Sequence, residues 1–135
     1  MPYLAAIALL ASSCCPKNNE GQEKELRFHD GVFRIAQVCD IHYGCTDTDK
    51  LARIREMVTK TVEEEHPDLF VFTGDAVTGS DDAHKGWLDM IEIFDGTGIP
   101  WAVVLGNHDA EANVGINADS IFTYLSAARN IVNVR

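Results

Sequence analysis

The hydrophobic pattern of the chain switches between two periods. Continuous apolar runs, typical of strands covered on both faces of a parallel sheet, alternate with segments whose apolar residues lie three or four positions apart, typical of amphipathic helices. Strands are predicted at 32–39, 69–73 and 101–105, and helices at 48–65 and 81–94. This β-α-β-α-β order predicts an α/β fold with mainly parallel strands, joined by right-handed crossovers.

Turn and capping residues mark the ends of these elements. Asp30 and Gly31 lie between two runs of β-forming residues and predict a leading β-hairpin. Asp47 or Thr48 is expected to cap the first helix, and Pro67 to end it. The other expected boundaries are Asp81 or Asp82 and Asp119 as helix caps, and 131–134 as a further strand.

Polar residues follow each of the three core strands. The carboxyl ends of parallel strands meet at one edge of a sheet, so these side chains are expected to lie together. Residues two apart in an extended chain point the same way, so Asp40 and His42 are expected to share one side. Their oxygen and nitrogen donors suit hard or borderline divalent metals. They are Asp40, His42, Asp75, Asn107 and His108.

Composition narrows the classes of protein that fit this pattern. With 135 residues, 46% of them hydrophobic and 24% charged, the chain fits one globular domain. The formal net charge of −10 and the scattered Lys and Arg argue against a nucleic-acid surface. An anionic substrate would therefore need a bound metal to reverse the local field.

The first residues differ in character from the rest of the chain. Residues 4–11 form an apolar run that is too short to span a bilayer but long enough for a signal sequence. With the small residues before Cys14 it resembles a bacterial lipoprotein signal, so we expect export and a lipid anchor on Cys14, facing the periplasm or the cell exterior. The alternative is an apolar strand or helix docked on the domain. The expected divisions are 1–14 as signal, 15–25 as polar tether and 26–135 as folded domain.

Four other residues have side chains that could serve in a site, but the hydrophobic pattern places them in the packed interior or in solvent. Cys39 and Cys45 are too few for a disulfide scaffold and are expected to be small, half-buried residues, although outside the cytosol they could pair. Trp87 falls on the apolar face of its helix and is expected in the core, and His84 is expected in solvent rather than against a substrate.

Three short motifs carry a family resemblance. D-x-H at Asp40 and His42, G-D at 74–75 and G-N-H-D at 106–109 occur in this order, and together they resemble the calcineurin-like metallophosphoesterase family. The amino-acid sequences of 35–44, 67–75 and 104–109 are similar to those of its purple-acid-phosphatase-like branch. The likeness covers roughly residues 26–135 and implies the N-terminal part of that family's α/β sandwich.

The resemblance implies a metal-dependent phosphoester hydrolase, a phosphatase or a phosphodiesterase, with a dinuclear site. The two ions would be divalent or of mixed valence, with manganese, iron and zinc all open. Asp40 and His42 would bind the first ion, and Asp75 would bridge both. Asn107 would bind the second ion. The implied catalytic residues are His108, which would face the leaving-group oxygen, and Asp109, which would position the turn or this histidine.

Two departures from the family pattern shape the expectation. Thr78 stands where true purple acid phosphatases have a tyrosine, so iron–phenolate chemistry is not implied. The family takes further histidines from later chain, and no histidine follows His108. We therefore expect the chain to be the N-terminal part of a longer enzyme and to be inactive by itself. The rival hypothesis is a non-catalytic, lipid-anchored surface or binding module.

Overall fold

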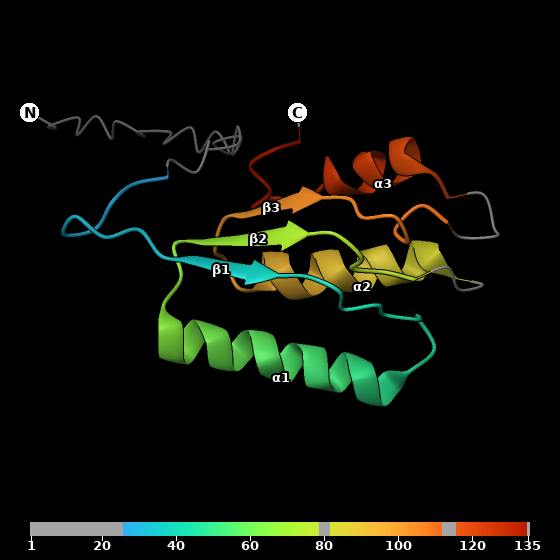
Figure 1. Cartoon of the computed structure of the whole chain (residues 1–135), viewed down its shortest axis with the longest axis horizontal. Coiled ribbons are helices and arrows are strands. Elements are labelled where there is room, and N and C mark those ends of the chain that lie inside the picture. Colours follow the sequence, from blue (N-terminus) through green and yellow to red (C-terminus); the bar gives the residue numbers. More distant parts are fainter. Residues whose placement is uncertain (1–25, 79–81, 112–115, 135) are drawn as a thin grey trace, which may run out of the picture.

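The computed structural model describes residues 26–78, 82–111 and 116–134, and the predicted signal and tether lie outside this part of the chain. Strands and helices alternate along it (Figure 1). The predicted α/β fold is confirmed, since the strands form one parallel sheet in the order β1-β2-β3. The elements are β1 (Ile35–Val38), α1 (Thr48–Glu65), β2 (Leu69–Thr73), α2 (Ala83–Gly96), β3 (Trp101–Val104) and α3 (Ala118–Leu125).

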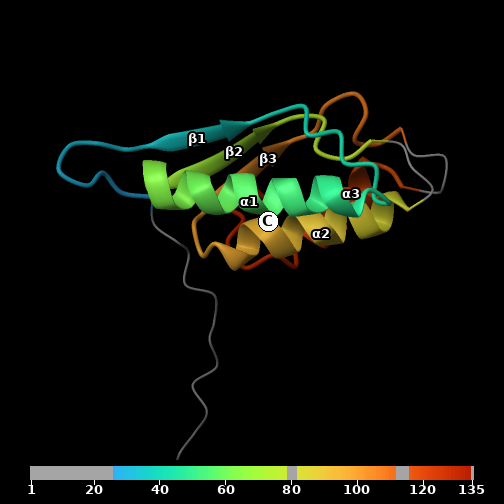
Figure 2. The ribbon, with the colours of Figure 1, turned by 90° about the horizontal axis from the view of Figure 1, so that it is seen from below.

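Helices α1 and α2 lie together on one face of the sheet (Figure 2). Phe72 of β2 meets Phe94 of α2 edge to face, with ring centroids 4.4 Å apart. Trp87, predicted to be in the core, and Trp101 are each 1% exposed. Burying a phenylalanine such as Phe72, which is 1% exposed, contributes about 1.5–3 kcal/mol, so this layer stabilises the sheet from which the strand-end loops extend.

The described elements leave the opposite face of the sheet without a cover. Ile35 in β1 and Val104 in β3 are 58% and 59% exposed, whereas Val103, one residue away and directed at the helices, is 2% exposed. The expectation of strands covered on both faces is therefore not met within the described residues. Both described sheet-covering helices, α1 and α2, lie on the same side (Figure 2).

The predicted hairpin is present as a tight turn with a single antiparallel pair. Asp30 and Gly31 have φ of 51° and 78°, and His29 bridges to Val32. The ladder goes no further, because the backbone N–H of Arg34 already donates to the Asp68 carboxylate at 2.7 Å. The first strand therefore begins at Ile35 and not at residue 32 as predicted.

Most helix boundaries agree with the sequence. Asp47 caps α1 by accepting from the Lys50 N–H at 2.8 Å, and Asp82 caps α2 in the same way. His66 ends α1 in a left-handed conformation with φ of 48°, directly before Pro67. Within the described ranges no helix is long and apolar enough to cross a membrane.

The last two boundary predictions are wrong. Asn117, not Asp119, caps α3, because its side-chain oxygen accepts from the Ser120 N–H at 2.9 Å. No strand forms at 131–134 among the described residues; Ile131 makes one parallel bridge to Trp101. The Asn133 side chain then takes the next ladder positions, with its oxygen 3.0 Å from the Val103 N–H nitrogen and its amide nitrogen 2.7 Å from the Val103 carbonyl oxygen.

Three side chains lie in other surroundings than predicted. Cys39 is exposed and Cys45 is buried, so the pair is not equally half-buried, and the two do not form a disulfide with each other. His84 is partly buried against α3, where its Nδ1 lies 2.5 Å from the Tyr124 hydroxyl. The expectation of a solvated His84 is wrong because the packing of α2 on α3 encloses one side of the ring.

Candidate metal centre

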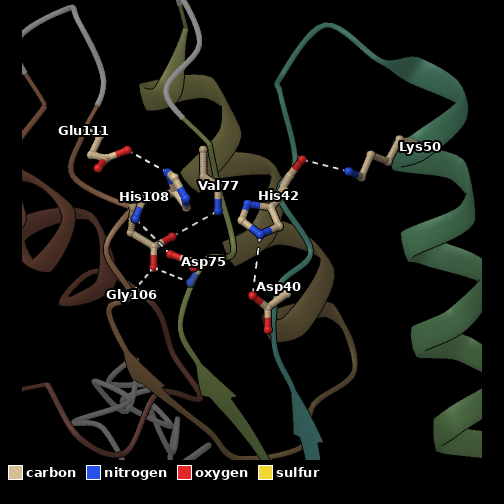
Figure 3. Close-up of polar contacts among 9 residues, drawn as sticks. Asp40, His42, Lys50, Asp75, Val77, Gly106, His108 and Glu111 are labelled. Carbon is tan, nitrogen blue, oxygen red and sulfur yellow. Dashed lines mark hydrogen bonds and ion pairs between the residues drawn. The ribbon is translucent and has the colours of Figure 1, made fainter.

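The loops that follow β1 and β2 continue side by side beyond the ends of the strands. The Asp40 N–H donates to the Gly74 carbonyl oxygen at 3.1 Å, and the His42 N–H donates to the Asp75 carbonyl oxygen at 2.9 Å. These bonds extend the parallel register of the sheet into irregular chain. They bring Asp40 and His42 next to Asp75, residues more than thirty positions apart in sequence (Figure 3).

Asp40 and His42 are neighbours for a different reason from the one predicted. The strand ends at Val38, and both residues have a positive φ, of 52° and 48°, so strand alternation does not direct their side chains. They meet all the same, with the His42 Nε2 3.5 Å from the Asp40 Oδ1. Aspartate and histidine enter the left-handed region more readily than most residues, and the bonds to the neighbouring loop hold them there.

Two glycines allow the loops after β2 and β3 to touch. A Cβ on Gly74 would lie 2.9 Å from the Gly106 Cα, and Gly74 has a φ of 108° that side chains rarely adopt. A Cβ on Gly106 would lie 2.2 Å from the Asp75 Oδ1. The glycines in the G-D and G-N-H-D motifs are therefore required by contact between the loops.

Asp109 ties the same two loops together from inside the protein. It is 1% exposed, and its Oδ2 accepts from the N–H groups of Asp75 at 2.8 Å and Gly106 at 2.7 Å. Its Oδ1 accepts from the Val77 N–H at 3.0 Å. A buried carboxylate that satisfies three backbone donors is a positioning group, and it orients the turn that presents Asp75 and His108.

The Asp75 carboxylate is held from the other side by the motif that follows β3. Its Oδ1 accepts from the backbone N–H of His108 at 2.8 Å. The imidazoles of His42 and His108 then meet edge to face, with ring centroids 5.3 Å apart and planes at 66°. The loop after each of the three strands thereby contributes one residue, His42, Asp75 or His108, to a single cluster (Figure 3).

His42, Asp75 and His108 each offer a donor atom within 4.8 Å of the other two. A divalent ion bonded at about 2.0–2.2 Å spans about 4 Å between opposite ligands, so this group fits such an ion after small side-chain rotations. Two imidazole nitrogens and a carboxylate oxygen are a donor set that zinc, iron and manganese accept. The residues present therefore fit a metal.

This gathered group differs from the predicted ligand set. It contains His108, which the family resemblance assigns to catalysis, and it does not contain the predicted ligand Asp40. Asp40 is paired with His42, and its side chain is 66% exposed. Asn107 is exposed in the loop that follows β3. The roles of these residues stay predictions.

Two residues around the centre were not found from the sequence. Lys50 donates from its Nζ to the His42 carbonyl oxygen at 2.8 Å, which ties α1 to the loop (Figure 3). Glu111 lies with its Oε2 2.6 Å from the His108 Nδ1. The three-residue spacing from His108 to Glu111 is the one signal in the sequence that could have drawn attention to the glutamate.

The thiol of Cys39 borders the centre without joining the donor group. A hydrogen bond to the Asp40 carboxylate is the main cause that raises the pKa of this thiol, with burial and the charge of Asp40 adding to it. The Cys39 sulfur does not belong to the group of donor atoms that His42, Asp75 and His108 bring together. The site therefore keeps the oxygen and nitrogen character that the sequence predicts.

Gly106→Ala is expected to lower the free energy of unfolding by about 2 kcal/mol and to weaken metal binding. The added methyl would lie 2.2 Å from the Asp75 Oδ1 and 2.6 Å from the Asp75 nitrogen, so the two loops must separate. Urea denaturation and calorimetric titration with Mn²⁺ measure the two effects. Gly96→Ala is the control, since its methyl meets nothing within 4 Å. Equal results for both variants would contradict the close approach.

A family model for calcineurin-like phosphoesterases matches residues 33–133. The chain belongs to this family. The resemblance found in the three motifs is thus confirmed. Membership in the calcineurin-like phosphoesterases implies the class of metal-dependent phosphoester hydrolases, and the donor group of His42, Asp75 and His108 lies within the matched residues.

Individual relatives agree with the family. The chain is 39% identical to probable inactive purple acid phosphatase 28 of Arabidopsis thaliana, over 75% of this chain and 29% of that protein. It is 35% identical to probable inactive purple acid phosphatase 14 of the same plant, over 82% and 32% of the two chains. It is 28% identical to phosphatase DCR2 of Saccharomyces cerevisiae, over 70% and 19%. The chain thus spans less than a third of the length of these relatives.

Proposed function

We propose that the protein of which this chain is a part hydrolyses phosphoesters with a dinuclear metal centre. The observation that carries the proposal is the convergence of His42, Asp75 and His108, from the ends of three parallel strands, with donor atoms within 4.8 Å. Family membership supplies the reaction class. The name phosphatase on the yeast relative supports the same class.

In this proposal Asp40 and His42 hold the first ion, Asp75 bridges the two, and Asn107 holds the second. The ions are manganese, iron or zinc, and when bound they supply positive charge that attracts and polarises the phosphoryl group. The chain's own net charge of −10 would otherwise repel such a substrate. Asn107 can contribute an oxygen without cancelling that positive charge.

His108 has the second role in the proposal, as proton donor to the leaving-group oxygen. An imidazole at this place can also act as a ligand, since its ring belongs to the gathered donor group. The family resemblance favours the proton donor. Asp109 supports this role from beneath, because its buried carboxylate sets the course of the turn that carries His108.

The rival proposal is a non-catalytic module, and one observation favours it. Two plant relatives carry the words probable inactive in their names. Either protein would be exported and anchored by a lipid on Cys14 if the apolar run at 4–11 acts as a lipoprotein signal. The two proposals differ in whether metal binding leads to turnover.

Metal removal distinguishes the hydrolase from the non-catalytic module. When the full-length protein is dialysed against a chelator, its rate of aryl phosphate hydrolysis is expected to fall at least about tenfold. Adding Mn²⁺, Zn²⁺ or Fe²⁺ is expected to restore the rate. Metal content is measured alongside the rate. Retained metal without turnover on mono- or diesters would favour the non-catalytic module, and turnover that survives complete metal removal would contradict the metal centre.

A further inference from the structure

Glu111 lies beside His108 at the edge of the metal centre, outside the motifs. Its Oε2 is 2.6 Å from the His108 Nδ1 (Figure 3). The backbone joins the same two residues, because the Glu111 N–H donates to the His108 carbonyl oxygen at 3.2 Å. We propose that Glu111 is a positioning residue, which holds the His108 imidazole so that its Nε2 is available to the leaving-group oxygen.

The chemistry of the pair decides where the proton on the ring lies. An ionised carboxylate has no proton to give, so in this contact the His108 Nδ1 carries the hydrogen and donates it to Glu111. The partner of one ring nitrogen sets the state of the other. Nδ1 is therefore occupied by the glutamate, and Nε2 is left as the nitrogen that takes up a proton from solvent, which makes the ring an imidazolium, and passes that proton to the leaving-group oxygen.

Three contacts position His108, one through its backbone and two through its ring. Its backbone N–H donates to the Asp75 Oδ1 at 2.8 Å, which fixes the main chain at the centre. The His42 ring packs against it at a centroid distance of 5.3 Å. Glu111 supplies the third contact, at the Nδ1. Without it the imidazole keeps its place but can turn about its own side-chain bonds.

The pair is too exposed to serve mainly in folding. The side chains of His108 and Glu111 are 43% and 54% exposed, and exposed ion pairs contribute little to stability. A role in orientation is different, because proton transfer depends on the direction of the donor. Loss of Glu111 is therefore expected to leave the fold intact and to change the reaction.

This inference rests on the proposed hydrolase function, and kinetics tests it in the full-length protein. Glu111→Ala is expected to lower kcat by about 10-fold to 100-fold on an alkyl phosphate, with little change in KM or metal content. The loss on a nitrophenyl phosphate is expected to be smaller, because that leaving group departs without a proton. Glu111→Gln, whose amide oxygen can still accept from Nδ1, is expected to restore part of the rate.

Glu56→Ala is the matched control. Glu56 also forms a short exposed pair within its own segment, with its Oε1 2.7 Å from the Lys60 Nζ, on the surface of α1. This variant is expected to match the unaltered protein on both substrates. An equal loss on both substrates in Glu111→Ala, a Glu111→Gln variant no better than Glu111→Ala, or a parallel loss of metal would each overturn the inference.

A measurement without turnover keeps the inference separate from the proposed function. Nitrogen-15 spectra of the imidazole rings in this chain report which nitrogen carries the hydrogen when the ring is neutral. His108 is expected to carry it on Nδ1, and Glu111→Ala is expected to shift it toward Nε2. An unchanged tautomer would overturn the role of Glu111 even if hydrolysis is established, whereas an inactive protein that shows the shift would fail the proposed function alone.

Discussion

Asp75→Asn is expected to lower kcat for an aryl phosphate by about 1000-fold, corresponding to about 4 kcal/mol of lost metal assistance. Asp75 has a φ of 55°, and asparagine is among the residues that adopt this conformation readily. The remaining oxygen can still accept from the His108 N–H, so the loop keeps its course. What disappears is the negative charge that a bridging ligand needs. Metal content and steady-state rates with Mn²⁺ measure the effect.

Asp30→Asn is a closely matched control for this variant. Asp30 also has a left-handed conformation, with φ of 51°, but lies in the exposed turn before β1. The same change of charge and amide chemistry is therefore made away from the centre, and full activity is expected. If Asp75→Asn retains both its metal and its rate, the bridging assignment is wrong.

Asp109→Asn is expected to reduce the free energy of unfolding by about 3 kcal/mol. The two carboxylate oxygens accept from three backbone N–H groups, at 2.7–3.0 Å. Asparagine offers one oxygen, so its amino group must face at least one of these donors in a place that is 1% exposed. The buried tryptophans allow urea denaturation to be followed by fluorescence.

Glu64→Gln makes the same exchange of carboxylate for amide on the exposed surface of α1. Its effect is expected to stay within about 0.5 kcal/mol. Similar midpoints for Asp109→Asn and Glu64→Gln would show that the buried bonds to the loops do not stabilise the fold. A large loss for Asp109→Asn alone supports the view that this residue acts by holding the loops rather than by touching substrate.

Local patterns in the sequence were sufficient for most of the fold. The helix at Thr48–Glu65 and the strand at Leu69–Thr73 have the predicted bounds, because helical spacing, a capping aspartate and a following proline all act within a few residues. The start of β1 was misplaced. Its position depends on the bond from Arg34 to Asp68, which joins residues 34 positions apart and leaves no local signal.

The site was predicted in outline for a similar reason. Parallel strands place their carboxyl ends at one edge, so the motifs after β1, β2 and β3 had to meet once the strand order was known. The backbone conformations of the residues at this edge could not be predicted from the sequence. Asp40 and His42 were expected to follow strand alternation, but hydrogen bonds to the next loop hold both in left-handed conformations.

The sequence by itself determined the α/β class, the family and the three motifs, since periodicity and short-range residue types carry that information. Only the tertiary structure showed that Asp109 faces three amides, that Gly74 and Gly106 touch, and that Glu111 engages His108. These contacts depend on how two loops approach each other and on the direction of individual side chains. Both follow from packing of the whole sheet edge, which no local pattern encodes.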